Sequence, residues 1–176
     1  MQGHFLFSIG HGNKDIHAFL QELEQFNIEY LIDVRSRPYS RFHPQFNKKA
    51  LEITMRELGI VYIFMGEQLG GLPDDPSCLS SGKVDYNKLK EKDYFKKGLE
   101  RLAKAHSEGI RAAIMCSEGK PEQCHRTRLI GEELRIRGIK LMHIQRSKKE
   151  KNKILLSSQS EVMGYTDPGL FGKTDK

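Results

Sequence analysis

The stretch that decides the fold runs Gly109-Ile110-Arg111-Ala112-Ala113-Ile114-Met115-Cys116-Ser117-Glu118-Gly119-Lys120-Pro121-Glu122-Gln123-Cys124-His125-Arg126-Thr127-Arg128-Leu129-Ile130. Its apolar run, Ile110 to Met115, is short and follows a glycine, which is typical of a parallel strand covered on both faces. Pro121 suits the first turn of a helix, because the N–H that proline lacks has no partner there. The stretch therefore predicts a buried strand, a tight loop and the start of a helix.

A turn residue followed by isoleucine occurs four times, each time after an amphipathic segment. The four copies are Asn27-Ile28, Gly59-Ile60, Gly109-Ile110 and Gly138-Ile139. Glycine or asparagine after a helix takes the left-handed conformation that ends it. Repeated helix–turn–strand units indicate a parallel sheet. We expect an α/β protein: a single three-layer domain with a mainly parallel sheet of about five strands flanked by helices.

The pattern divides the chain into an α/β domain at residues 1–145 and a basic, polar C-terminal tail at residues 146–176. Between Gln145 and Lys153 stand five basic residues and one acid. Such a run is usually solvated or disordered. The alternative is that the tail docks on the domain.

Composition bounds the class of protein and of partner. The chain has 176 residues, a net charge of +6 and three cysteines, Cys78, Cys116 and Cys124. An odd, sparse set of cysteines favours free thiols over a disulfide framework. No segment resembles a signal peptide or a membrane span, so we expect a cytoplasmic location and no membrane partner. The positive charge favours an anionic small molecule or nucleic acid, although an ordinary basic surface would give the same charge.

Polar residues and glycines gather where the predicted strands end. In an open parallel sheet, ligands bind beyond the carboxyl ends of the strands. Four of the predicted strands lead into such residues, namely Ser8, Gly10 and His11; Asp33 and Arg35; Glu67, Gly70 and Gly71; and Cys116 and Glu118. The opposite edge carries only the plain turns, so we expect the functional site at the carboxyl edge.

The residue types at this edge predict chemistry on an anionic substrate. Cys116 is the candidate nucleophile or redox thiol, and Glu118, His11 and His125 are candidates for proton transfer. The candidate substrate-binding residues are Gly10, Asp33, Arg35, Arg37, Ser40, Gly70, Gly71, Cys124 and Arg126. Structural alternatives remain for several of them: Asp33 and Arg35 as an ion pair, Cys116 as a small buried apolar residue, and Arg126 bound to an acidic side chain of its own protein.

The loop at residues 35–49 mixes basic and aromatic residues. Such a mixture suits phosphate contacts combined with base stacking. The alternative is an ordered loop whose aromatic side chains pack inward while its arginines stay in water. We expect the aromatic residues to pack inward and some of the arginines to face an anion.

Two further chemistries are weighed at the cysteines. Cys116, Cys124 and His125 have the right ligand types for zinc, with a fourth ligand from His11 or His43, but their spacing matches no common zinc signature. We therefore predict no metal, and the sequence identifies no cofactor. Phosphatase loops also place a cysteine between a strand and a helix, but they require an arginine six residues later, where this chain has Glu122.

Taken together, these motifs resemble the DUF488 family of uncharacterised proteins. The matching segments are Ser8-Ile9-Gly10-His11, Asp33-Val34-Arg35 with Pro38 and Ser40, Leu69-Gly70-Gly71, and Met115-Cys116-x-Glu118 continuing to Pro121-x-x-Cys124-His125-Arg126. The resemblance covers roughly residues 4–145. It implies an α/β domain in which these motifs lie near one another, and it supplies no activity, substrate or cofactor.

Three functional hypotheses follow. The first is an enzyme acting on a phosphate-bearing or other anionic substrate, a nucleotide or nucleic acid, with Cys116, Glu118, His11 and Arg35 at its site. The second is a non-catalytic nucleic-acid or anion-binding module. The third is a domain supported by a metal bound to cysteine and histidine. The reaction type and the oligomeric state do not follow from the sequence.

Overall fold

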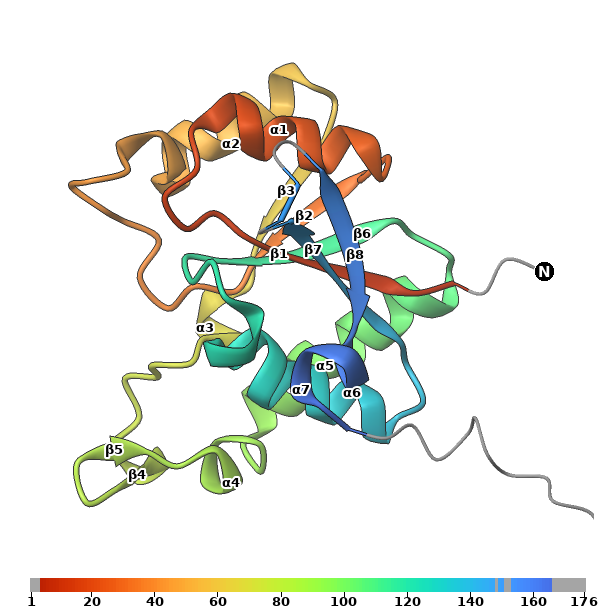
Figure 1. The fold of residues 1–176 in the computed structure, drawn as a ribbon. Coiled ribbons are helices and arrows are strands. Elements are labelled where there is room, and N and C mark those ends of the chain that lie inside the picture. The colour runs from red at the N-terminus through yellow and green to blue at the C-terminus, as the bar shows by residue number, and fades with distance from the viewer. Residues whose placement is uncertain (1–3, 148, 151–152, 166–176) are drawn as a thin grey trace, which may run out of the picture.

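The structure is a computed structural model that describes residues 4–147, 149–150 and 153–165. A six-stranded sheet crosses its middle in the order β3-β2-β6-β1-β7-β8 (Figure 1). The strands are β1 Leu6–Gly10, β2 Tyr30–Asp33, β3 Val61–Phe64, β6 Ala112–Cys116, β7 Leu141–Arg146 and β8 Ile154–Ser158. A separate two-stranded sheet pairs β4 Leu79–Ser80 with β5 Lys83–Val84.

Five strands of the main sheet are parallel, as the repeated turns predicted. β1 lies between β6 and β7, and β2 lies between β3 and β6. Their carboxyl ends therefore meet at one edge, where Gly10 pairs with Cys116 and Asp33 pairs with Met115.

Helices cover both faces of the sheet, which gives three layers. In Figure 1, α1 Ile16–Gln25 and α2 Lys48–Glu57 lie above the strands, and α3 Gly66–Leu69, α5 Asp93–Ser107 and α6 Glu132–Ile136 lie below them. The remaining short helices are α4 Tyr86–Leu89 and α7 Gln159–Met163. A 3-10 turn at Pro121–Gln123 and a π-helical turn at Arg126–Gly131 lead into α6.

Each face of the sheet has its own apolar core. On one face, Phe19 and Leu23 of α1 and Leu51 of α2 pack with Phe7 and Met115 of the strands. On the other, Leu99 and Leu102 of α5 and Leu134 of α6 pack with Leu6 and Ile114. Because neighbouring strand residues point to opposite faces, a strand such as β6 is buried throughout. This explains why its sequence is a continuous apolar run.

The predicted left-handed turns are present. Asn27, Gly59, Gly109 and Gly138 have φ angles of 48°, 73°, 70° and 72°. The first three precede the amino ends of β2, β3 and β6, and Gly138 precedes β7. These turns lie at the amino edge of the sheet and leave the carboxyl edge to the longer loops.

The segment after Gln145 adds a strand that the sequence did not predict. β8 pairs antiparallel with β7, so the sheet has six strands instead of about five. Arg146, predicted within a solvated basic run, pairs with the buried Glu22 at 2.8 Å. The sequence left open whether the tail is solvated or docks on the domain. Residues 153–165 dock on it through β8 and α7. Residues 148, 151–152 and 166–176 lie outside the described residues.

The long connection between β3 and α5 is ordered by short elements. It contains α3, the β4–β5 hairpin and α4, and the hairpin projects from the body of the molecule in Figure 1. Cys78 is buried there, with its Sγ 3.4 Å from the Tyr94 hydroxyl. Within the described part of the chain, no helix is long and apolar enough to cross a membrane.

Candidate functional site at the carboxyl edge of the sheet

The ends of three neighbouring strands place His11, Arg35 and Cys116 at one edge. The His11 N–H donates to the Cys116 carbonyl at 3.1 Å, and the Val34 N–H donates to the Met115 carbonyl at 3.0 Å. These main-chain bonds extend the sheet by one residue beyond its regular ladder. The predicted convergence of motifs is therefore present in the structure.

A tight loop, Ser117–Lys120, follows Cys116 and is stabilised by hydrogen bonds from Arg126 and within the loop. The guanidinium of Arg126 donates to the Glu118 carbonyl at 2.6 Å, and the Glu118 carboxylate accepts the Lys120 N–H at 2.9 Å. Gly10 lies directly under this loop, and a Cβ there would collide with the Glu118 carbonyl. Gly10 thus permits the close approach of two loops, and its role in substrate binding stays a prediction.

Arg126, predicted to bind substrate, is enclosed by the protein in this structure. Its side chain is 1% exposed and donates through Nε to the Ser8 hydroxyl at 2.9 Å. Among the described residues it forms no ion pair with a carboxylate. Its charge is used inside the protein, where it fixes the Glu118 carbonyl.

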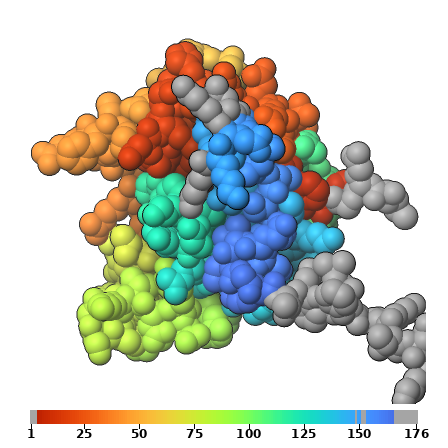
Figure 2. Space-filling model, viewed as in Figure 1, coloured from red at the N-terminus to blue at the C-terminus, as the bar shows by residue number. Residues whose placement is uncertain are grey.

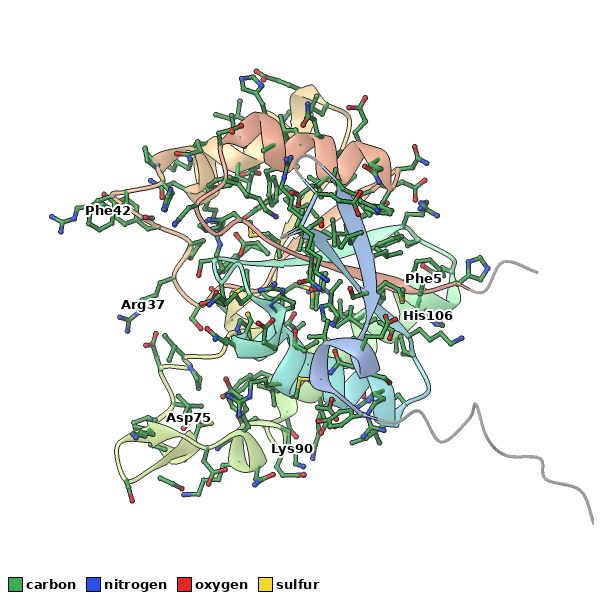
Figure 3. The ribbon with its side chains drawn as sticks, in the orientation of Figure 1. Phe5, Arg37, Phe42, Asp75, Lys90 and His106 are labelled. Atoms are coloured by element: carbon green, nitrogen blue, oxygen red, sulfur yellow. The ribbon has the colours of Figure 1, made fainter. Side chains whose placement is uncertain are left out.

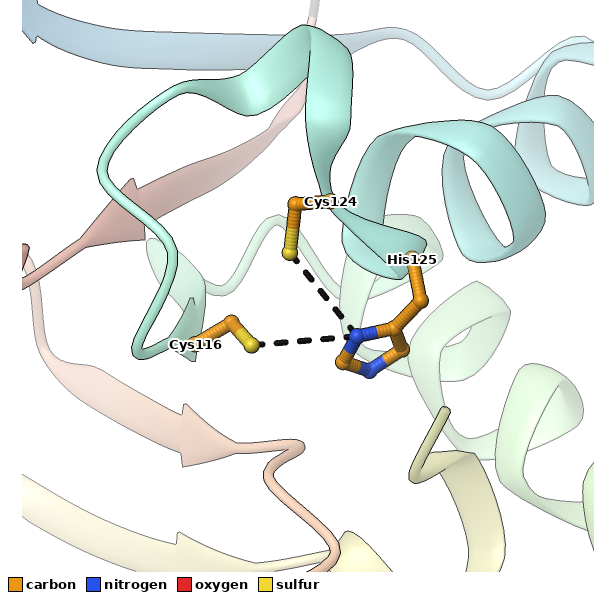
Figure 4. A group of neighbouring side chains, drawn as sticks. All are labelled: Cys116, Cys124 and His125. Carbon is orange, nitrogen blue, oxygen red and sulfur yellow. Dashed lines mark hydrogen bonds between the residues drawn. The ribbon is translucent and has the colours of Figure 1, made fainter. Parts of the chain in front are cut away.

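Cys116, Cys124 and His125 form a compact cluster (Figure 4). The His125 Nδ1 lies 3.7 Å from the Cys116 Sγ and 3.8 Å from the Cys124 Sγ. All three donor atoms lie within 4.8 Å of one another. Cys116 comes from the end of β6, whereas Cys124 and His125 precede the π-helical turn, an irregular element that is frequent at functional sites.

The two thiols of this cluster differ in acidity. A hydrogen bond from the Cys124 thiol lowers the pKa of Cys116 far below its usual value against the opposing effect of burial, and His125 and the Glu118 main-chain N–H act in the same direction. The same hydrogen bond, together with burial, raises the pKa of Cys124. Cys116 is therefore the more acidic thiol of the pair.

His125 is oriented by contacts on its other side. Its Nε2 lies 3.1 Å from the Val34 carbonyl, which can only accept, so Nε2 carries a proton and donates. Gly71 packs against the ring, and a Cβ at this glycine would lie 2.7 Å from the His125 Cγ. Gly71, predicted to bind substrate through its backbone, makes room for the histidine and also lines the smaller cavity described below. Gly70 similarly makes room for the Ser36 side chain.

His11 is buried with one unused nitrogen. Its Nδ1 donates to the Gly12 carbonyl at 2.9 Å, and its ring stacks on Phe46 with centroids 4.4 Å apart. Its Nε2 has no hydrogen-bond partner among the described residues. Burial lowers the pKa of His11 to about 4, with Arg35 and His43 adding to the effect against the Gly12 hydrogen bond. The ring is neutral at pH 7, and its Nε2 lone pair can accept a proton.

Asp33 and Arg35 form an ion pair, which is the structural alternative that the sequence left open for these two residues. Two side-chain hydrogen bonds join them, Nε to Oδ1 at 2.9 Å and NH2 to Oδ2 at 2.6 Å, and the Arg35 main-chain N–H donates to Oδ1 at 3.1 Å. NH2 also donates to the Phe46 carbonyl, and Tyr62 donates to Asp33 at 2.6 Å. Asp33 is fully buried and lies behind the arginine, so it positions Arg35 and does not itself line either cavity described next.

Two adjoining cavities open at this edge. The larger, of about 580 Å³, is lined by His11, Arg35, Arg37, Ser40 and Lys120, among others. The smaller, of about 280 Å³, is lined by Cys116, Cys124 and His125. Four residues belong to both cavities: Arg35, Arg37, Ser117 and Glu118.

The aromatic residues of the 35–49 loop do not all pack inward as predicted. Phe46 is buried, but Tyr39 is 72% and Phe42 is 83% exposed. The loop projects from the body at the left of Figure 2, and Figure 3 shows Phe42 at its tip and Arg37 directed away from the sheet. Ser40 shapes the loop by accepting the N–H groups of Phe42 and His43.

Several cavity residues were missed by sequence reasoning. Ser117, Gly119 and Lys120 line the larger cavity from the same loop that carries Glu118, and Ser36 lines the smaller one beside Arg35. These four residues stand close to predicted site residues in the sequence, and this was the one signal that could have identified them. Gly12 lines the larger cavity as well, and its N–H is used by the Ser117 carbonyl.

Comparison with known families gives one match. The model of a domain of unknown function, DUF488, matches residues 15–132. This span contains the motifs around Asp33, Gly70 and Cys116, and the motif at Ser8–His11 precedes it. Comparison with curated proteins and with solved structures gives no match.

Proposed function

The chain belongs to the DUF488 family, a domain of unknown function, and from its own geometry we propose that it is an enzyme acting on a phosphate-bearing or other anionic substrate. One observation carries the proposal: two adjoining cavities share Arg35 and Arg37 and bring them beside Cys116 and His11. Cationic groups that hold an anion next to a nucleophile and a proton acceptor are the minimum set for group transfer.

Each residue has a separate part in this proposal. Arg37 and Lys120 attract the anion at the open rim, and Arg35, fixed by Asp33, contacts it deeper in the cavity. Cys116 is the reacting group, since it is a nucleophilic residue that lines the smaller cavity beside Arg35 and Arg37. His11 accepts a proton through its unpartnered Nε2, and Glu118 shapes the loop that separates the two cavities.

The test of the anion site uses inorganic phosphate as the probe and alkylation of Cys116 as the readout. We expect phosphate to slow the reaction of Cys116 with iodoacetamide in a saturable way, as followed by peptide mass spectrometry in the presence of a chelator. Cys78, which is buried away from both cavities, serves as the internal control. Alkylation that is indifferent to phosphate would argue against an anion site at Cys116.

The test of turnover follows a panel of nucleoside mono- and diphosphates by chromatography. We expect the protein to consume at least one of them, and Cys116→Ala to abolish that consumption while leaving the far-ultraviolet circular dichroism unchanged. Consumption that persists in Cys116→Ala would remove Cys116 from the mechanism, and no consumption of any of them would leave only the anion-binding part of the proposal.

A second candidate is a non-catalytic module that binds single-stranded nucleic acid. It is favoured by Tyr39 and Phe42, which stand exposed on a loop that also carries Arg37 and Arg41. Bases would stack on the two rings and the arginines would contact phosphates. Binding of a short oligonucleotide should then weaken steeply with salt and should be lost in Tyr39→Ala/Phe42→Ala. Unchanged binding in that double variant would reject this candidate.

A further inference from the structure

We propose that Cys116, Cys124 and His125 bind one thiophilic divalent cation, of which zinc is the best fit. Each of the three residues offers one donor atom, and the three donors lie within 4.8 Å of one another in the structure (Figure 4). This site goes beyond the proposed function and does not depend on it, because it requires only these three side chains. A bound cation occupies the Cys116 sulfur, so the reaction proposed for Cys116 belongs to the metal-free protein.

The two sulfur–nitrogen distances match those of a tetrahedral metal site. With zinc–sulfur bonds of about 2.3 Å and zinc–nitrogen bonds of about 2.1 Å, tetrahedral sulfur and nitrogen ligands lie about 3.6 Å apart. The His125 Nδ1 lies 3.7 Å from one sulfur and 3.8 Å from the other. The side chains therefore need only small movements to take up a cation.

The orientation of His125 is also that of a metal ligand. Metal-bound histidines almost always donate their second ring N–H to a carbonyl or carboxylate. The Val34 carbonyl accepts from Nε2 here, and Gly71 fits against the ring and restricts its position. In the neutral ring, the lone pair of Nδ1 then lies on the side of the two sulfurs.

Hydrogen bonds among the three side chains explain the two nearly equal sulfur–nitrogen distances less well than a bound cation does. Whether it donates or accepts, Nδ1 offers one position for a hydrogen bond, yet both sulfurs lie at nearly the same distance from it. A cation placed among the three donors interacts with all of them at once. Two sulfurs and one imidazole select a soft or borderline metal such as zinc and disfavour magnesium and calcium.

The three ligands leave a fourth position that faces the smaller cavity. His11 and His43, the fourth ligands suggested by the sequence, are not part of the group. Catalytic zinc sites typically have three protein ligands and leave the fourth position to water or substrate. Arg35 and Arg37 line the same cavity, so an anionic group has room to approach that position.

Cobalt(II) titration of the full chain, stripped of metal and fully reduced, tests the site. Thiolate-bound cobalt has a near-ultraviolet charge-transfer band, which we expect to saturate at one cobalt per chain and to disappear when zinc is added. Cys116→Ser and Cys124→Ser should each lose the wild-type band, and Cys78→Ser should keep it. No band in the wild-type protein, or an unchanged band in Cys116→Ser, would overturn the proposal.

A second measurement on the wild-type protein covers variants that fail to fold. Zinc should slow alkylation of both Cys116 and Cys124 without changing that of Cys78, as mapped by peptide mass spectrometry. Equal alkylation with and without zinc would count against the site. These readouts use metal alone, so their failure is distinct from a failure of phosphate to protect Cys116 in the metal-free protein.

Discussion

Two histidines at the sheet, His143 and His11, share almost every property except the number of their partners. Both are buried, and burial lowers the pKa of each to about 4. Both nitrogens of His143 have partners, Ser8 at Nδ1 and Gln159 at Nε2, each at 2.9 Å. His11 uses Nδ1 only.

The partners of His143 form a continuous chain of donors and acceptors. Arg126 donates to Ser8, Ser8 donates to His143, and His143 donates to the Gln159 side-chain oxygen. The Gln159 amide in turn donates to the Thr127 carbonyl and to Glu132. This network ties α7, and with it the C-terminal segment, to the arginine that holds the Glu118 loop.

The difference separates buried polar groups that support the fold from those available to a ligand. A polar group is costly to bury without a partner, and native structures pair nearly all of them. Both ring nitrogens of His143 have partners in this network, so this histidine has no nitrogen left for a ligand. His11 and the Cys116–Cys124–His125 cluster are incomplete, and both lie on the cavities of the carboxyl edge.

The largest expected effect is on stability at acid pH. The ordinary pKa of 6.5 in the unfolded chain exceeds the folded value of about 4 for both histidines. Between these values the unfolded chain binds protons that the folded protein does not, so stability is complete above pH 6.5 and falls as the pH drops toward 4. The expected loss is about 3 kcal/mol for each histidine.

Urea unfolding of the wild type, His143→Gln and His11→Gln at pH 7.5 and pH 4.5 measures this effect. Each substitution should remove the contribution of its own histidine, so that the difference between the two pH values shrinks by a similar amount in both variants. An unchanged difference in His143→Gln would show that this histidine is not held neutral in the fold.

The next effect separates the two histidines at pH 8, where both are neutral in either state. His143→Phe removes the acceptor of the Ser8 O–H and the donor to the Gln159 oxygen, and we expect a loss of about 3 kcal/mol. His11→Phe keeps the stacking on Phe46 and leaves only the Gly12 carbonyl, so its cost should be about 1 kcal/mol. Urea unfolding measures the loss in free energy of unfolding for each variant. Equal losses would contradict the difference proposed between the two histidines.

The same two histidines show what the sequence can predict. His11 follows a strand and lies between glycines, so it could be assigned to the carboxyl edge before the fold was known. The carboxyl edge of the sheet could be predicted from the strand pattern and the left-handed turns, because each of these depends only on residues that are neighbours in the sequence. The convergence of motifs at this edge followed from the parallel order of the strands.

The roles of individual residues could not be obtained in this way. Whether Arg126 faces a ligand or the Glu118 carbonyl depends on a contact across eight residues and two changes of chain direction. Gly71 meets His125 across more than fifty residues of sequence. β8 and its link to His143 through Gln159 were hidden by the basic composition of the segment that precedes them.

The smallest expected effect tests whether the cavities that contain His11 and Cys116 bind an anion. Arg37 is largely exposed and forms one long ion pair with Asp74 at 3.6 Å, so Arg37→Gln should change the free energy of unfolding by less than about 0.5 kcal/mol. Its charge lines both cavities, and its loss should weaken phosphate binding about fivefold, the equivalent of about 1 kcal/mol for one exposed charge. Arg41→Gln is the matched control, since it removes the same charge from the same loop at a residue that lines neither cavity. Phosphate affinity measured by calorimetry should fall in the first variant only, because an equal fall in both would mean that net charge, and not the cavity beside Cys116 and His11, attracts the anion.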